Sequence, residues 1–149
     1  MAKTFKSVLK VIEKVAADNA SALQKTFSVN MLGKIARDTP VDTGRATANW
    51  ILQAGSPNLS PMRLKDPSVT ATLTIQRAEK AARTAPKKTT LYISNAVQGQ
   101  DDSGKLTGEG YIIGLERGKS VQSPSGMMFQ KNVALAPQIS ANSLKEIFR

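Results

Sequence analysis

The chain has 149 residues, of which 40% are hydrophobic and 5% aromatic, so it can form one domain with an aliphatic core. It contains neither cysteine nor histidine, which excludes disulfides, thiol catalysis and Ser-His-Asp triads and removes the usual zinc ligands. The formal net charge is +10, and residues 1–88 hold 15 basic against 6 acidic side chains, which indicates an acidic partner such as nucleic acid or another protein's acidic face.

Residues 4–36 are expected to form one long helix. Apolar side chains recur there at steps of three and four residues, namely Phe5, Val8, Ile12, Val15, Leu23, Phe27, Met31 and Ile35. Lysines at 6, 10 and 14 lie on another face. The N-terminus lacks the apolar core of a signal peptide, because Lys3, Lys6 and Lys10 interrupt it, so we expect cytoplasmic synthesis without secretion. Because the helix exceeds the usual globular length, we expect part of it to pack on a neighbouring subunit, unless it breaks near Asp18 or Gly33.

The segment that follows predicts a capped turn. Pro40 disfavours helical backbone in the residue before it, so the long helix should end near Arg37 or Asp38. Asp42 is a good cap for a new helical turn, and Gly44 permits a tight bend or a close backbone approach.

After this turn, the chain should form a short helical turn and then a strand over residues 50–54. Arg45 supplies one charge, and Trp50 is the only indole and is expected in the core because it begins an apolar strand. Three prolines between residues 55 and 67 predict an extended loop, whose length is typical of a binding or contact role.

A second helix is predicted over residues 67–85, with Asp66 as its cap and Pro67 as its first residue. Alternating threonines keep a strand over 69–75 open as a competing interpretation. On the helix, basic side chains form a stripe down one side: Arg77, Lys80, Arg83 and Lys87. This stripe could follow the phosphates of DNA or meet an acidic protein.

The remainder of the chain alternates between short elements and loops. Residues 89–97 predict a strand, and residues 98–110 predict an extended polar loop. Residues 111–117 are expected to form a short apolar element, and residues 127–148 predict a last helix that Pro137 should kink or split. Together these elements predict one α+β domain over 1–149, with a small sheet packed by the N-terminal, middle and C-terminal helices.

No catalytic set emerges from these residues. Gly114 and the Gly118-Lys119-Ser120 triplet lack the spacing of a P-loop, and Asp101-Asp102 lacks the alternating ligands of a calcium loop. A magnesium nuclease would need carboxylates and a lysine around one ion, which Asp66 and Glu79-Lys80 match only loosely. We therefore expect neither enzyme activity nor a cofactor or metal.

Four segments, taken in order, resemble the neck or tail-completion family of tailed bacteriophages, also described as minor tail or head–tail joining proteins. The segments are Thr39–Arg45 with Asn49-Trp50, Leu91–Ala96, Tyr111–Glu116 with Gly118, and the loop with Pro124 and Gly126 that precedes the last helix. The resemblance implies a structural virion protein, made in the host cytoplasm, that joins or completes the tail at the neck. It implies rings of identical copies with heterologous contacts, and partners in the head-side adaptor and the tail, without a membrane.

Within this interpretation, Asp42 caps the turn and Arg45 pairs with Glu116. Pro40, Gly44 and Trp50 complete the candidate assembly corner. The alternative from another class is a small basic protein that binds DNA nonspecifically, and it predicts strongly salt-dependent binding. A magnesium nuclease is the third interpretation.

Overall fold

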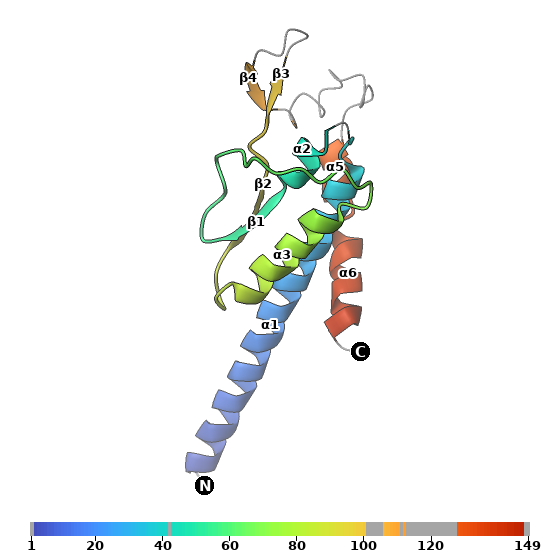
Figure 1. Ribbon diagram of the computed structural model, residues 1–149. Coiled ribbons are helices and arrows are strands. Elements are labelled where there is room, and N and C mark those ends of the chain that lie inside the picture. Colours follow the sequence, from blue (N-terminus) through green and yellow to red (C-terminus); the bar gives the residue numbers. More distant parts are fainter. Residues whose placement is uncertain (1, 42, 101–105, 111, 113–127, 148–149) are drawn as a thin grey trace.

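The computed structural model describes residues 2–41, 43–100, 106–110, 112 and 128–147 (Figure 1). Helix α1 (Ala2–Asp38) is 37 residues long, about 55 Å at the usual helical rise, and it is unbroken at Asp18 and at Gly33. Its upper half is flanked by α3 (Thr72–Thr84) and α6 (Ala136–Ile147), whereas its N-terminal half extends beyond the rest of the molecule (Figure 1).

The predicted α+β class is confirmed. Strand β1 (Ile51–Ala54) pairs antiparallel with β2 (Leu91–Ser94), with Leu52 opposite Ile93. The short helix α2 (Arg45–Ala48) connects α1 to β1, and the loop over 55–67 is extended, as expected.

The core lies where α1 and α3 meet the β1–β2 pair. Leu32 and Ile35 of α1 are fully buried there, together with Trp50, Leu52 and Ala78. Ile139 of α6 packs against this cluster from the other side of α1. The predicted core position of Trp50 is confirmed, since only 4% of the residue is exposed.

Helix α3 begins at Thr72, so the predicted start at Pro67 is wrong, and no strand forms over 69–75. The backbone turns first, because Ala71 has φ 53° and ψ 36° and its N–H donates to the Ser68 carbonyl over 3.1 Å. A standard cap directly precedes the first helical residue, so a cap at Asp66 would start the helix at Pro67. Here the left-handed Ala71 stands between Asp66 and the helix, which begins after it.

The polar loop predicted over 98–110 contains two strands. β3 (Gln98–Gln100) and β4 (Leu106–Gly110) pair antiparallel, with an irregular register between Gln98 and Gln100. This pairing uses backbone groups and needs no alternation of apolar and polar side chains, so the sequence pattern does not reveal it.

The C-terminal helix is split, as Pro137 predicts. Helix α5 (Met128–Ala134) ends before Leu135, and α6 starts at Ala136 with the proline in its first turn. A proline is tolerated there because the first helical N–H groups have no partner within the helix.

Candidate functional site

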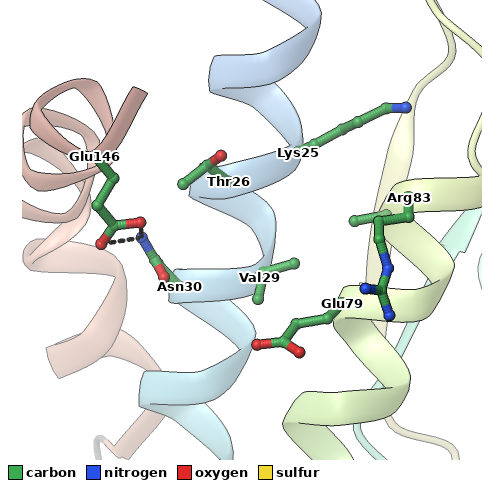
Figure 2. Close-up of a pocket in the computed structure, with 8 residues that line it drawn as sticks. Lys25, Thr26, Val29, Asn30, Glu79, Arg83 and Glu146 are labelled. Carbon is green, nitrogen blue, oxygen red and sulfur yellow. Dashed lines mark hydrogen bonds between the residues drawn. The ribbon is translucent and has the colours of Figure 1, made fainter. Parts of the chain in front are cut away.

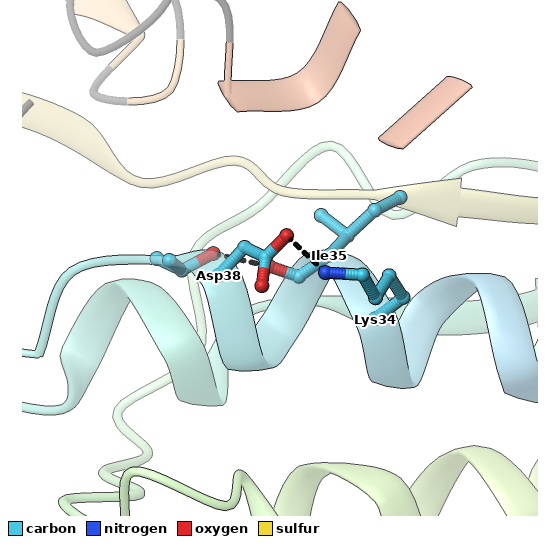
Figure 3. Close-up of polar contacts among 4 residues, drawn as sticks. Lys34, Ile35 and Asp38 are labelled. Carbon is cyan, nitrogen blue, oxygen red and sulfur yellow. Dashed lines mark hydrogen bonds and ion pairs between the residues drawn. The ribbon is translucent and has the colours of Figure 1, made fainter. Parts of the chain in front are cut away.

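A buried hydrogen-bond chain ties the end of α1 to the start of β1. The Thr39 hydroxyl donates to the Ile35 carbonyl over 2.9 Å and accepts from the Trp50 indole N–H over 2.8 Å. Figure 3 shows this end of α1, where the exposed Lys34 also pairs with Asp38 over 2.7 Å. The indole thereby satisfies its polar N–H within the core, as buried Trp side chains usually do.

Gly44 is the sharpest point of the corner. It has φ 71°, and its carbonyl accepts from the N–H groups of both Ala48 and Asp66, each over 3.0 Å. A Cβ atom built on this glycine would lie 2.5 Å from the Asp66 backbone. Both the left-handed conformation and the close approach therefore require glycine, which confirms the prediction of a tight bend here.

Two asparagines attach neighbouring segments to the corner. Asn49 donates to the Met62 carbonyl over 3.1 Å and accepts from the Met62 N–H over 2.6 Å, so it holds the 55–67 loop against α2. Asn95, just after β2, donates to the Ala46 carbonyl over 2.8 Å. Sequence reasoning assigned no role to Asn49 or Asn95, although both lie inside the segments that carry the phage resemblance.

The other predicted corner residues are placed as follows. Pro40 and Arg45 are half-buried at the edge of the corner. Asp42 and Glu116 lie outside the described residues, and so do the proposed cap and the proposed Arg45–Glu116 ion pair.

Asp66 is buried and caps α3 from outside the helix. One carboxylate oxygen accepts from the N–H and the hydroxyl of Thr74, each over 2.8 Å, and the other accepts from the Ser68 hydroxyl over 2.6 Å. Burial raises the pKa of Asp66, but the hydrogen bonds from Ser68 and Thr74 lower it, and the net shift is downward. With 0% of the residue exposed, this carboxylate is withdrawn from the surface where a nuclease would bind its ion and substrate.

Arg77, which the sequence placed in the basic stripe, is half-buried and is bound to neighbouring groups of the fold. Its guanidinium donates to the Ala48 carbonyl over 2.6 Å and to the Thr74 hydroxyl over 3.2 Å. Burial lowers the pKa of Arg77 while nearby Asp66 raises it, with a net decrease, yet an arginine stays charged at neutral pH.

The other three residues of the stripe differ in whether they are free to contact another molecule. Lys87 lies beyond the end of α3 and pairs with Asp18 of α1 over 2.6 Å, which lowers the pKa of Asp18. Lys80 and Arg83 are exposed on α3. Of the four cations that the spacing places in one row, Lys80 and Arg83 are therefore the two that remain exposed and whose side chains have no hydrogen-bond or ion-pair partner among the described residues.

Residues 6–16 of α1, which we call the arm, expose five large aliphatic side chains. Val8, Leu9, Val11, Ile12 and Val15 are each between 43% and 61% exposed. Every described arm residue is in the exposed class, whereas Leu32 and Ile35 of the same helix are buried. Large apolar side chains gathered on one projecting element usually mark a surface that another molecule covers.

Between α3 and α6, the surface of α1 forms the floor of an open trough of about 360 Å³ (Figure 2). The residues that line it include Thr26, Val29, Asn30, Glu79, Ala82 and Glu146. Lys25 and Arg83 complete the lining, and the Lys25 ammonium is held by the Ala85 carbonyl over 2.6 Å.

Neither metal sites nor membrane spans are found in the described part of the chain. No three His, Cys, Asp or Glu side chains there are grouped as ligands of a metal ion, and no described helix is long and apolar enough to cross a membrane. Comparisons of the chain with protein-family models, curated proteins and solved structures gave no match.

Proposed function

We propose that this protein is a structural component of a tailed-phage virion, located at the head–tail junction, where a ring of copies joins or completes the tail. The observation that carries the proposal is the aliphatic arm of α1, since a chain that worked alone would gain nothing by exposing Val8, Val11 and Ile12. The ordered resemblance of four segments to neck and tail-completion proteins supports this particular kind of assembly.

The corner suits a positioning role. Gly44, Asn49 and Asp66 connect α2, the 55–67 loop and α3 through hydrogen bonds, and Thr39 joins the end of α1 to Trp50. These bonds fix the direction in which α1 leaves the body, and hence the direction of the arm. In this proposal the protein catalyses no reaction, and its partners are other copies, the head-side adaptor and the tail proteins.

The proposal is tested by making virions without this protein and imaging them by negative-stain electron microscopy. We expect separate heads and tails, or tails of abnormal length, and we expect the added protein to restore normal particles. Normal infectious particles made without the protein would contradict a role in the neck. A neighbourhood of portal and tail genes would be consistent with the proposal and is simple to check.

Nonspecific DNA binding is the second candidate, and the net charge of +10 favours it. The charge is less available than its count suggests, because Arg77 is bound to the Ala48 carbonyl and Lys87 to Asp18. The two candidates differ in a titration of the isolated chain with duplex DNA. Tight binding that falls steeply with salt supports the second, and weak binding supports the first.

A further inference from the structure

The arm carries its lysines on the face opposite its aliphatic side chains. Lys6, Lys10 and Lys14 follow one another at steps of about 6 Å along the axis and stay within about 80° of the helix circumference. Lys10 lies about 160° away from Ile12, at ~100° per residue. All three lysines are exposed, so the arm presents a straight row of cations about 12 Å long.

The turn between α3 and β2 continues this row onto the body. Lys87 in the turn pairs with Asp18 over 2.6 Å, one helical turn beyond Lys14. The hydrogen bond from Lys87 lowers the pKa of Asp18, and the charge of nearby Lys14 lowers it further. Lys88 follows in the same turn and is exposed. Figure 1 shows this turn at the end of α3, close to where the arm leaves the body.

The charges of this surface are available to another molecule. We call it the lysine ridge, and it consists of Lys6, Lys10, Lys14 and Lys88. No hydrogen bond or ion pair between described residues holds any of these four ammonium groups. Of the carboxylates on the same stretch of α1, Asp18 is paired with Lys87, and Glu13 offsets one charge of the ridge. The ridge therefore keeps an excess of positive charge.

Lys88 has a backbone conformation that favours glycine. Its φ is 59°, in the left-handed region, which costs free energy for a residue with a side chain. Strained residues of this kind concentrate at binding sites, where the side chain is needed in spite of the strain. A lysine at this position thus points to a use of its charge.

The surroundings of the ridge match a phosphate backbone better than a protein surface. A protein–protein interface has an apolar centre, but the large aliphatic side chains of the arm lie on its other face, whereas protein–DNA interfaces are polar and strongly positive. Lys6 and Lys14, about 12 Å apart, span roughly three to four phosphates of one strand. Residues 6–18 contain no aromatic side chain that could stack on a base, which predicts contact without sequence preference.

We infer that the lysine ridge binds the phosphate backbone of duplex DNA without reading its sequence. The inference rests on the proposed function for the source of the duplex, which is the DNA that passes a head–tail junction. Lysines are flexible point charges, so they tolerate phosphates that change position as the duplex moves. Only four contacts are made, so the binding is weak at physiological salt and lets the duplex slide.

The test is a titration of a short labelled duplex with the full chain, followed by fluorescence anisotropy at several salt concentrations. Four phosphate contacts predict a slope of log K against log salt of about −3.6, so the affinity should fall about 150-fold between about 50 and 200 mM salt. Lys10→Ala/Lys14→Ala should have a slope of about −1.8 and lose only about 12-fold over this range. Two duplexes of unrelated sequence should give the same values.

Two further variants serve as controls. Lys80→Ala/Arg83→Ala removes the same charge from exposed positions of α3, and it should leave the slope at about −3.6. Lys88→Gly should make the slope smaller by about 0.9. Its urea midpoint should stay the same or rise, because glycine adopts the left-handed backbone without strain. Circular dichroism confirms that each variant is folded.

The outcomes separate this inference from the proposed function. An unchanged slope in Lys10→Ala/Lys14→Ala, or a change confined to the α3 variant, overturns the contact at the ridge. Polyglutamate that displaces the labelled duplex as well as unlabelled duplex does, at equal charge, also overturns it and favours an acidic protein as the partner. In each case virion imaging still decides the function, and normal virions made without the protein would leave a measured DNA contact standing.

Discussion

At the scale of single residues, the corner depends on a few groups whose chemistry leaves little choice. Gly44 provides a left-handed backbone next to Asp66, and Thr39 joins the helix end to the indole of Trp50. The restrictive types of Pro40, Gly44 and Trp50 made a tight corner predictable from the sequence. The role of Asn49 was not predictable, because its partner Met62 is 13 residues away and nothing in a local pattern encodes that contact.

Gly44→Ala should destabilise the protein strongly. The left-handed backbone costs an alanine roughly 1–2 kcal/mol, and the clash with the Asp66 backbone adds about 1–3 kcal/mol. Gly55→Ala is the matched control, because Gly55 has φ 86° but nothing within 4 Å of the added Cβ, so only the backbone cost applies. Urea unfolding of the two variants measures the difference. Equal losses would show that the close approach to Asp66 is unimportant.

Asp66→Asn should lower stability at neutral pH by about 1–3 kcal/mol, because four hydrogen bonds converge on a buried carboxylate. The folded protein lowers the pKa of Asp66 below the ordinary value of 3.8. The contribution of the charge is therefore complete above that pH and is lost as the pH falls through the folded-state pKa. Unfolding curves of wild type and variant should accordingly converge in acid. A constant gap from pH 7 to pH 2 would rule out the charged form as the stabilising species.

At the scale of elements, α1 is one helix with two environments. Residues 21–36 pack against α3, α6 and the sheet, whereas the large aliphatic side chains of the arm are between 43% and 61% exposed. Isolated helical segments of this length are marginal in water, so the arm depends on continuity with the rest of α1 for its helical form.

Amide hydrogen exchange of the dilute protein should show this division. We expect fast exchange over residues 6–16 and slow exchange over residues 24–36, because protection follows burial and packing. Raising the protein concentration until copies associate should protect the arm selectively, and Ile12→Asp should remove that protection. Uniform exchange along α1 at low concentration would contradict a two-part helix.

The elements also show which parts of the fold the sequence patterns predict and which parts they miss. The 3.6-residue period of α1 and the β-rich run at 91–94 specified those elements well, since each pattern continues for its full length. The predicted start of α3 was wrong, and the helix begins five residues later than expected. The reason is that Asp66 caps the helix from a distance, with the left-handed Ala71 between them. The β3–β4 pair was missed because its polar, glycine-containing strands have no apolar face.

At the scale of the whole molecule, charge and shape set what the protein can meet. The net charge of +10 was evident from the sequence. The sequence did not show which of the cations are bound within the fold, because the partners of Arg77 and Lys87 come from distant segments. The candidate stripe therefore shrinks to Lys80 and Arg83. The trough likewise became visible only when α6 was seen beside α1.

Duplex DNA should bind the isolated chain only weakly, with a dissociation constant of about 10⁻⁴–10⁻⁶ M at physiological salt. If Lys80 and Arg83 make the phosphate contacts, replacing both with alanine should reduce the slope of log K against log salt by about 1.8. Arg77→Ala should instead lower stability, because the Ala48 carbonyl loses its buried donor. Nanomolar binding with a steep slope would favour the DNA-binding alternative.

The trough has a consequence for the order of events during synthesis. Its floor at Asn30 and its wall at Glu146 are 116 residues apart, so at ~5–20 residues per second the ribosome needs about 6–23 s to make the second after the first. During that interval the nascent chain has the α1 floor of the trough but not its α6 wall. The trough is therefore complete only after the last helix has been made and has packed on α1.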